Sequence, residues 1–334
     1  MSADQIDIGI VGVGFIGELH ARLQTEHPQT NLRTVIDLDK TRANEVADQF
    51  DVPNVYTDID AALDEHELDA IVVATPESYH RDPTITALDR GVAVLLEKPI
   101  AKTVEDAQAI GKAANESSAQ LMIAYVCRFH PKYAALKTRV DEGDLGEILA
   151  VTASRVANRE IYEMAAEWSH PMYYLAVHDI DVMLWYVDAN VESVTADASS
   201  GLGDVETPGA VSATLKFDSG AIGALETNWA RSDEYPTIRT DEVSLTGRDG
   251  YAKLVMEPNR AKIAASSGFE YFDSPELHGR WTDMYRFQLD HFITTVNTDT
   301  EPLVTWEDGL RSLAVANAIV EATESGERIP LEAD

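Results

Sequence analysis

The chain contains a single cysteine, Cys127, so no disulfide bond can form within it. Its cysteine and histidine residues show no spacing typical of a zinc site, and we expect no bound metal. No apolar run approaches the roughly eighteen residues that a membrane-spanning helix needs. The first residues also lack the basic flank and apolar core of a signal peptide. Together these absences predict a soluble cytoplasmic protein.

Basic residues are scarce as well. Of 334 residues, 58 are acidic and 26 are basic, which gives a formal net charge of −32. The acidic residues are spread along the chain, and this argues against nucleic acid or an anionic membrane as a partner. Similar compositions occur on proteins of a high-salt cytoplasm, where ions screen the repulsion between carboxylates. We interpret the charge as adaptation to a halophilic host, and not as evidence about the substrate.

Near the N-terminus, a short apolar run leads into glycines at positions 12, 14 and 17, then a helical pattern, and then a second apolar run that ends at Asp37. Gly12 permits a tight turn, Gly14 lets backbone N–H groups approach a pyrophosphate, and Gly17 allows the helix to pack closely on the strand. The N-terminus of that helix favours phosphate. Asp37 is placed to accept hydrogen bonds from an adenosine ribose. The stretch predicts a dinucleotide site; the alternative is a tight turn without a ligand.

Asp37 also bears on which nicotinamide cofactor binds, because its carboxylate would repel the 2′-phosphate of NADP. No arginine or serine stands beside it to receive that phosphate. Lys40 and Arg42 are close in sequence, but we expect them in the first turn of the next helix, facing solvent. NAD is therefore favoured over NADP.

Strand-like and helical patterns alternate through the first part of the chain, which predicts a doubly wound parallel sheet of the Rossmann type. Ligands of such sheets bind beyond the carboxyl ends of the strands. Besides the glycine turn, three segments fall at predicted strand ends: Asp37, Thr75–Pro76 and Glu97–Lys98–Pro99. We expect a ligand to lie against these segments.

Lys98 stands at the end of a buried strand, immediately before Pro99. The proline biases Lys98 toward extended backbone geometry, and the bond between them can adopt the cis form. A lysine held in this way can donate a hydrogen bond to a reacting oxygen, and burial can lower its pKa. The alternative is a surface lysine where the strand ends. The local residues leave both open.

The alternation then gives way to strand-like segments that follow one another without helices. Turn signals such as Asp218–Ser219–Gly220 and Asp249–Gly250 predict hairpins. We therefore expect two domains, residues 1–125 with the Rossmann fold and residues 126–334 with an α+β fold, in which helices cover one face of a large, mostly antiparallel sheet. A last helix is expected at about residues 307–324. The predicted strands are residues 147–156, 191–198, 210–217, 221–228, 242–246 and 251–256.

A helical segment in the second half carries His178, Asp179 and Asp181 among apolar residues. A lone histidine on an apolar helix is most often a hydrogen-bonded core residue. Imidazole also suits proton abstraction from an alcohol, because its ordinary pKa lies near neutrality. Asp181, about one turn later, would orient the ring or a neighbouring backbone group, or serve as a polar structural anchor.

Several of these motifs occur in the same order in one known family. They are the three glycines, Ala74–Thr75–Pro76 with His80, Glu97–Lys98–Pro99, and the His178-Asp-Ile-Asp181 sequence. On these motifs the sequence resembles the glucose–fructose oxidoreductase / inositol dehydrogenase family, often called Gfo/Idh/MocA. The resemblance extends to the last helix and so covers nearly the whole chain.

The resemblance implies an NAD-dependent dehydrogenase that transfers hydride from a secondary hydroxyl of a sugar, inositol or related polyol to nicotinamide. Lys98 would contact the substrate hydroxyl and stabilise the alkoxide, His178 would take the proton, and Glu97 would hold the nicotinamide ribose. Arg128 would reach the cofactor or substrate, with a surface position as the alternative. The other implied cofactor contacts are Gly12, Gly14, Phe15, Ile16, Gly17, Asp37, Thr75, Pro76, His80 and Lys98.

One position departs from the family pattern. Its sugar and polyol dehydrogenases commonly have an aspartate four residues before the histidine, and this chain has Tyr174 there. The spacing places Tyr174 and His178 on one helix face, so the phenol can still touch the substrate, and we include Tyr174 among the catalytic candidates. It cannot supply a carboxylate, and this puts the usual polyol specificity in question.

Two alternatives to a polyol dehydrogenase remain, and Tyr174 in place of the aspartate favours the second of them. One is a sugar-nucleotide or keto-sugar oxidoreductase of the same family, and the other is a non-catalytic NAD-binding sensor or co-regulator. Family members often assemble through the open face of the second sheet, so the resemblance also implies a homo-oligomer, either a dimer or a tetramer.

Overall fold

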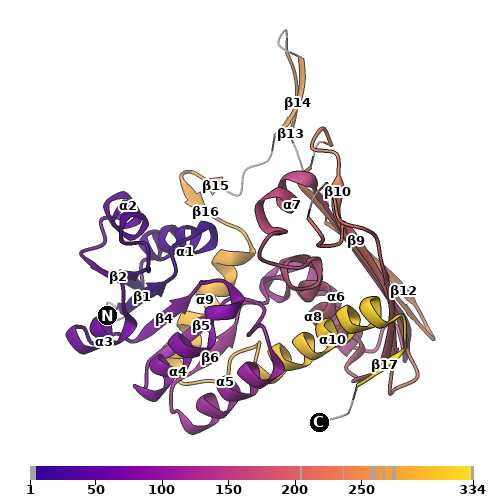
Figure 1. The fold of residues 1–334 in the computed structure, drawn as a ribbon, viewed down its shortest axis with the longest axis horizontal. Helices are drawn as coiled ribbons and strands as arrows, with labels where there is room; N and C mark the ends of the chain where they lie inside the picture. Colours follow the sequence, from indigo (N-terminus) through magenta and orange to yellow (C-terminus); the bar gives the residue numbers. More distant parts are fainter. Residues whose placement is uncertain are drawn as a thin grey trace. The chain divides into compact units, whose positions relative to one another are not determined.

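The computed structural model describes residues 5–203, 205–235, 237–256, 261–265, 268–272 and 276–331. They fall into two compact units, which are labelled by element in Figure 1. The first unit contains the chain up to Phe129 and residues 276–313, and the second contains residues 130–275 and those from 314 onward. The return of residues 276–313 to the first unit was not predicted. The division at residues 125 and 126 stays a prediction.

The first unit is built on a six-stranded sheet with the order β3-β2-β1-β4-β5-β6. All neighbouring strands in it are parallel, which confirms the predicted doubly wound sheet. The strand order reverses between β1 and β4, so the switch point at which such sheets bind ligands lies at the carboxyl ends of these two strands. The bounds are β1 Ile6–Val11, β2 Thr30–Ile36, β3 Asn54–Tyr56, β4 Ala70–Val73, β5 Ala93–Leu96 and β6 Leu121–Ile123.

Helices connect these strands, and short polar residues cap several of them. Asp39 accepts hydrogen bonds from the first turn of α2, and Thr103 caps α5 in the same way. Residues 276–313 pack on the same unit: a Cβ at Gly111 would lie 2.2 Å from the Trp306 ring, so only glycine fits there. The bounds are α1 Phe15–Glu26, α2 Lys40–Phe50, α3 Ile59–Glu65, η1 Glu77–Tyr79, α4 Arg81–Asp89, α5 Val104–Glu116, η2 Val126–Phe129, β15 Glu276–Leu277, β16 Arg280–Trp281 and α9 Met284–Thr298; α10 Trp306–Ser325 begins in this unit and ends in the second.

The second unit contains a seven-stranded sheet with the order β12-β11-β7-β10-β9-β8-β17. The two predicted hairpins are confirmed, since β9 pairs with β10 and β11 with β12 in antiparallel register. The sheet is mixed, because β7 and β10 pair in parallel. The strands are β7 Ile148–Asn158, β8 Val191–Ala198, β9 Ala210–Phe217, β10 Ile222–Arg231, β11 Arg239–Gly247, β12 Tyr251–Met256 and β17 Ile329–Pro330; a separate hairpin joins β13 Ala261–Ala265 to β14 Gly268–Phe272.

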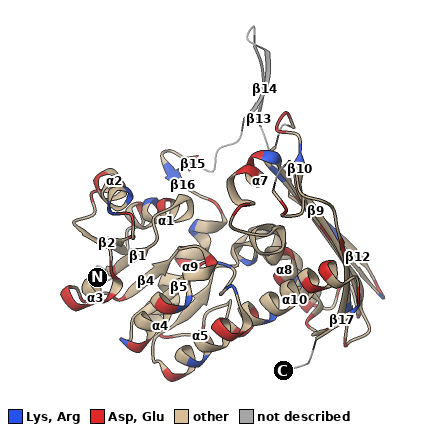
Figure 2. Ribbon diagram, in the orientation of Figure 1, with Lys and Arg blue, Asp and Glu red and all other residues tan. Residues whose placement is uncertain are grey.

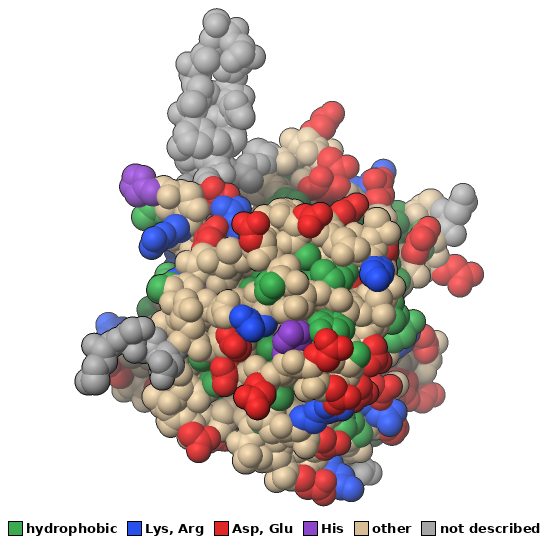
Figure 3. Space-filling model, turned by 90° about the vertical axis from the view of Figure 1, so that its left-hand side faces the viewer, with side chains coloured by type: hydrophobic (Ala, Val, Ile, Leu, Met, Phe, Trp, Pro, Cys, Tyr) green, Lys and Arg blue, Asp and Glu red, His purple; other side chains and the backbone are tan. Residues whose placement is uncertain are grey.

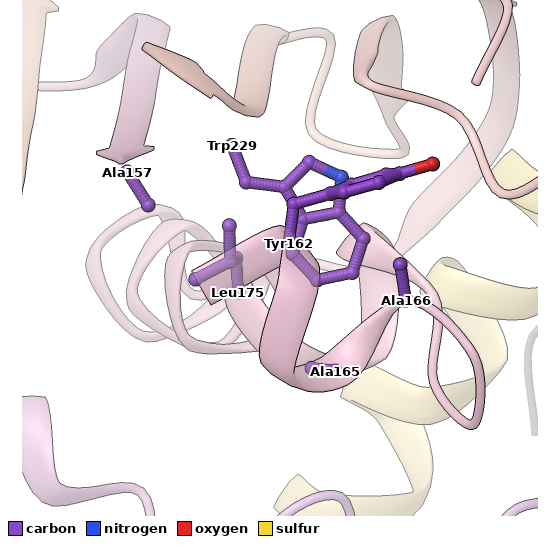
Figure 4. Packing of buried hydrophobic residues seen from close by; sticks show 6 residues of the cluster. All are labelled: Ala157, Tyr162, Ala165, Ala166, Leu175 and Trp229. Carbon is purple, nitrogen blue, oxygen red and sulfur yellow. The ribbon is translucent and has the colours of Figure 1, made fainter. Parts of the chain in front are cut away.

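Burial along this sheet follows the period of two that its sequence predicts. Alternate residues of β9 and β10 are buried, and those between them are mostly exposed. Helices α6, α7 and α8 lie beside one face of the sheet, as Figure 1 shows. The core there includes Trp229 of β10, whose ring meets the ring of Tyr162 edge to face at 5.4 Å (Figure 4). The helix bounds are α6 Pro131–Asp141, α7 Arg159–Ala165, a π-helical turn η3 Met172–Ala176, and α8 Val177–Val187.

Acidic side chains occur throughout the two units. Figure 2 shows red acidic positions on α3, α5 and α10, among others. On the face drawn in Figure 3 the acidic side chains are scattered between basic and apolar ones, and they do not form a tail or a single cluster. Within the part of the chain that the structure describes, no helix is long and apolar enough to cross a membrane.

Candidate cofactor and active site

The glycine turn joins β1 to α1 at the switch point of the first sheet. Gly12 has a φ of +85°, and a Cβ there would lie 2.7 Å from the backbone nitrogen of Thr75. A Cβ at Gly17 would lie 2.0 Å from the carbonyl oxygen of Gly12, so the helix can pack this closely only with glycine. A Cβ at Gly14 would meet nothing within 4 Å. The backbone of Gly14 therefore faces open space that a ligand can approach.

A cavity of about 710 Å³ lies at this turn, beyond the carboxyl ends of β1, β2 and β4. Its size is that of a pocket for a small molecule or cofactor. Five of the predicted cofactor residues line it: Gly12, Gly14, Asp37, Thr75 and Pro76.

Leu38 and Tyr79 line the same cavity and were not predicted from the sequence. Leu38 is 87 % exposed and Tyr79 is 64 % exposed. Large apolar side chains with so much free surface are suited to cover a flat ring. The sequence offered one signal for Leu38, which is an apolar residue directly after Asp37, the acid that follows β2.

Asp37 is fixed by hydrogen bonds from two backbone N–H groups. One carboxylate oxygen accepts from the N–H of Val13 at 2.8 Å, and the other accepts from the N–H of Asp39 at 2.9 Å. A carboxylate has about four lone-pair sites, so each oxygen keeps a site for another donor. This arrangement fits a diol such as that of a ribose.

The expectation that Arg42 faces solvent was wrong. Its Nε donates to the carbonyl of Val13 at 3.0 Å, and its Nη2 pairs with the carboxylate of Glu18. Arg42 reaches back because it lies in the first turn of α2, beside the glycine turn and the first turn of α1. Its charge is thus already matched by Glu18, while Lys40 is exposed as expected.

His80 is buried and lies between two strand ends. Its Nε2 lies 2.8 Å from the carbonyl oxygen of Thr75, and its Nδ1 lies 2.8 Å from that of Pro99. Burial lowers the pKa of His80, while the two carbonyl contacts and the charges of Glu97 and Glu77 act in the opposite direction. The ring thereby links the segment after β4 to the segment after β5. A direct contact with the cofactor stays a prediction.

The end of β5 carries the Glu97–Lys98–Pro99 motif. The Lys98–Pro99 peptide bond is cis, Lys98 is half-buried, and Glu97 is buried. One Glu97 oxygen lies 2.9 Å from Nε2 of His20, and the other accepts from the N–H of Lys98 at 3.2 Å. Burial raises the pKa of Glu97, but the His20 hydrogen bond and the charges of His20 and Lys98 outweigh it and lower the pKa overall.

Sequence reasoning missed His20. It stands three residues after Gly17, on the buried face of α1, and it is 1 % exposed. A histidine among the buried positions of an amphipathic helix was the only local signal, and nothing near it in the sequence pointed to Glu97.

The other predicted cofactor contacts lie around the same unit. Phe15, at the start of α1, is 80 % exposed, and Ile16 is half-buried. Arg128 is buried, and its guanidinium makes two contacts of 3.0 Å with the carboxylate of Asp308. A surface position for Arg128 is therefore excluded, and its contact with a cofactor stays a prediction.

The candidates of the second unit lie on one helical segment. Tyr174 is in the π-helical turn η3, and His178 follows near the start of α8. The ring of Tyr174 meets the ring of Trp168 edge-on at 5.7 Å and lies 6.3 Å from that of Trp229. Tyr174 is thus held by aromatic packing, beside the cluster of Figure 4. Lys98 belongs to the first unit, whereas Tyr174 and His178 belong to the second.

Asp179, the residue after His178, is fixed by an arginine that the sequence did not reveal. Arg155 of β7 donates to both oxygens of Asp179, at 2.7 and 3.0 Å, and to Asp241 of β11 at 3.1 Å. All three side chains are buried. Arg155 and Asp241 are direct partners in the β7–β11 register, so opposite charges at inward positions of two strands were the missed signal. Asp181 is also buried.

The first unit is a dinucleotide-binding fold of the Rossmann class. Its defining features are the order of the parallel strands, the glycine turn, the cavity at the switch point and the acid after β2. Two family models match the chain. One, described as oxidoreductase family, NAD-binding Rossmann fold, matches residues 6–125, and the other, described as oxidoreductase family, C-terminal alpha/beta domain, matches residues 137–331. The chain belongs to this family, the Gfo/Idh/MocA oxidoreductases, and its first unit is an NAD-binding Rossmann fold.

Individual relatives cover nearly the whole chain. A scyllo-inositol 2-dehydrogenase (NAD(+)) of Bacillus subtilis is 27% identical over 98% of this chain and 97% of its own length. A D-xylose 1-dehydrogenase (NADP(+)) of Haloferax volcanii is 26% identical over 97% of this chain and 98% of its own. The crystal structure of scyllo-inositol dehydrogenase from Lactobacillus casei with bound NAD(H) and scyllo-inositol aligns with a TM-score of 0.86, at 20% identity, over 98% of this chain and 99% of that one.

Proposed function

We propose that this protein oxidises a secondary hydroxyl of a cyclic polyol, with inositol as the reference substrate and NAD as the hydride acceptor. The observation that carries the proposal is the end of β5, where a half-buried lysine follows a buried carboxylate. This strand end is adjacent to β4, whose following residues Thr75 and Pro76 line the cavity. The Bacillus subtilis relative, named as an NAD-dependent scyllo-inositol 2-dehydrogenase, supports the same substrate class.

The residues at the switch point fit NAD. The open backbone at Gly14 suits the pyrophosphate, and the fixed carboxylate of Asp37 suits the adenosine ribose. Glu97 would accept hydrogen bonds from the nicotinamide ribose. When bound, NAD supplies a nicotinamide ring that accepts hydride. Because Asp37 would repel a 2′-phosphate and Glu18 already pairs with Arg42, NAD is favoured over NADP.

The chain's own residues would handle the proton and the charge of the alcohol. His178 would take the proton of the substrate hydroxyl as a general base. Lys98 would donate a hydrogen bond to the same oxygen and stabilise the negative charge that develops on it. The phenol of Tyr174 would contact a neighbouring hydroxyl, in the place where relatives with an aspartate offer a carboxylate. These three assignments are the catalytic part of the proposal.

An aldose is the second candidate substrate. The Haloferax volcanii relative, named as a D-xylose 1-dehydrogenase, supports it. A panel that contains both substrate classes separates the two.

We further propose that the protein works as a homo-oligomer in the cytoplasm of a halophilic host. The exposed face of the second sheet supports the first point. Ile222 is 57 % exposed and Tyr251 is 61 % exposed, and a hollow of about 470 Å³ on this face is lined by hydroxyl side chains such as Thr152 and Ser212. The excess of 58 acidic over 26 basic residues supports the second.

The test is NAD reduction at 340 nm in molar KCl, with scyllo-inositol, myo-inositol, D-xylose and D-glucose as substrates. Wild type is compared with Lys98→Ala, and with Lys102→Ala as a matched control, since Lys102 is an exposed lysine four residues later. The proposal predicts inositol turnover that Lys98→Ala abolishes and Lys102→Ala retains. Turnover of aldoses alone would favour the second candidate. NAD binding without turnover of any substrate would favour a sensor.

A further inference from the structure

Two buried side chains connect the glycine turn to the strand end that carries Lys98. His20 of α1 is 1 % exposed and Glu97 of β5 is 6 % exposed. Nε2 of His20 lies 2.9 Å from Oε1 of Glu97, although 77 residues separate them in sequence. Because α1 begins at the glycine turn, the contact ties the expected pyrophosphate site to the end of β5.

The surroundings of the His20 ring show that Glu97 is its principal polar contact. In the part of the chain that the structure describes, the buried Nδ1 of His20 has no hydrogen-bond partner. Buried polar atoms in proteins are almost always paired. The hydrogen bond to Glu97 therefore sets the orientation of the His20 ring, and the ring in turn sets the orientation of the Glu97 carboxylate.

Glu97 keeps capacity for a ligand after both protein contacts are counted. Oε1 faces His20, and Oε2 accepts from the backbone N–H of Lys98 at 3.2 Å. With about four lone-pair sites on a carboxylate, one site on each oxygen remains. One remaining acceptor site on each oxygen suits two neighbouring hydroxyl groups, such as those of a ribose.

We propose that His20 is a positioning residue for the cofactor site, which holds Glu97 in the orientation that accepts hydrogen bonds from the nicotinamide ribose. The inference rests on the proposed function, in which Glu97 is the ribose ligand. The charged or titratable groups that face Glu97 are His20 from α1, Lys98 from its own strand end, and His80 from the segment before α4. Of these, His20 contacts the carboxylate directly through its side chain, at 2.9 Å.

Removing His20 would change the protonation of Glu97 as well as its orientation. Without the ring, burial acts against the charged carboxylate with less to oppose it, so Glu97 becomes protonated at a higher pH. A protonated Glu97 loses acceptor sites for the ribose. NAD affinity should then weaken, and it should weaken further as the pH falls through a range where wild type is unaffected.

The experiment measures the Kd for NAD between pH 5 and 9 in molar KCl, by isothermal titration calorimetry. We expect His20→Leu to weaken NAD binding by about tenfold to a hundredfold, the loss typical of a hydrogen bond to a charged group, and to move the acidic limb of the profile to higher pH. His20→Gln should restore most of the affinity, because its Nε2 can reach the position of the histidine Nε2. His20→Asn, whose amide is shorter, should not.

A double-mutant cycle separates positioning from a general structural role. Once Glu97→Gln has removed the carboxylate, adding His20→Leu should cost little further affinity. Additive losses, or a His20→Leu profile identical to wild type, would overturn the inference. If His20→Leu does not fold, the test is the comparison of His20→Gln with His20→Asn. Equal NAD affinities of these two variants would also overturn the inference. Wild type that does not bind NAD would instead contradict the proposed function, because this readout is independent of turnover.

Discussion

Arg155 and Asp179 form a buried, two-pronged ion pair that fastens helix α8 to the sheet of the second unit. The two contacts are 2.7 and 3.0 Å long, and both side chains are 0 % exposed. Asp179 directly follows His178, so the pair fixes the backbone from which the proposed general base projects. The arginine also holds Asp241, which joins the neighbouring strand to the same network.

Breaking this network from one side should be costly. Asp179→Ala leaves Arg155 buried with only part of its charge matched, and we expect the free energy of unfolding to fall by about 3–5 kcal/mol. Urea unfolding at constant KCl measures the change. Glu142→Ala is the control, because Glu142 pairs with Arg139 on the surface, where such a pair contributes at most about 1 kcal/mol. Equal effects of the two substitutions would show that the buried pair is not an anchor.

Asp37 and Glu18 should together determine the preference for NAD. Asp37→Ser removes the carboxylate expected at the ribose, and we predict that the ratio of NADP to NAD affinity rises by about tenfold or more. Adding Glu18→Gln should raise it further, since Arg42 then loses the carboxylate with which it pairs. Glu18→Gln alone should leave NAD preferred. Kd values for both nucleotides test this prediction. If the double variant had the same ratio of NADP to NAD affinity as Asp37→Ser alone, the pairing of Arg42 with Glu18 would play no part in the preference.

His170 should make the protein less stable in mild acid. Burial lowers the pKa of His170 to about 4, from 6.5. Between pH 6.5 and about 4 this histidine is protonated in the unfolded chain but not in the folded one. The free energy of unfolding therefore falls as the pH drops from 6.5 toward 4, and it levels off below that. The full shift corresponds to about 3 kcal/mol as an upper value.

The matched variant for this effect is His170→Asn. Nδ1 of His170 accepts a hydrogen bond from the N–H of Met172 at 3.2 Å, and the asparagine oxygen can take its place. Unfolding midpoints at pH 4.5 and pH 7.5 give the comparison. The variant should lose less stability between the two pH values than wild type does. A wild-type loss no larger than that of the variant would refute the assignment to His170.

The local parts of the first unit were predictable from sequence because each depends on residues that are close in the chain. The turn at Gly12, the packing at Gly17 and the acid that ends β2 follow from backbone sterics and from one strand–helix–strand unit. The structure bears out both steric demands, because a Cβ added at Gly12 or Gly17 would lie only 2.7 or 2.0 Å from a backbone atom. The hairpins of the second sheet were predictable for the same reason, since turn residues and period-two burial are local signals.

Contacts between distant segments were not predictable in this way. The approach of His20 to Glu97 depends on how α1 crosses the sheet, and that of Arg155 to Asp241 depends on strand register. The membership of residues 276–313 in the first unit depends on contacts such as the one between Gly111 and Trp306. Arg42 shows the same limit at short range, because its direction depends on Glu18, 24 residues away.

The net charge of −32 predicts a dependence on salt. Repulsion among carboxylates opposes the folded state, and added ions screen it, with a Debye length of about 3 Å at 1 M against about 30 Å at 0.01 M. We expect the thermal midpoint to rise between low salt and molar KCl. Differential scanning calorimetry at the two concentrations measures it. A midpoint that does not rise would contradict the proposed adaptation to high salt.

The central claim is that hydride leaves the carbinol carbon of a cyclic polyol and is carried by NAD. The most direct measurement uses myo-inositol and scyllo-inositol deuterated at the ring carbons, with mass spectrometry of the nucleotide after turnover in molar KCl. Direct transfer predicts reduced nucleotide that is one mass unit heavier than with unlabelled substrate, and a lower rate with the labelled one. Reduced nucleotide without deuterium, or deuterium released to water, would contradict the account.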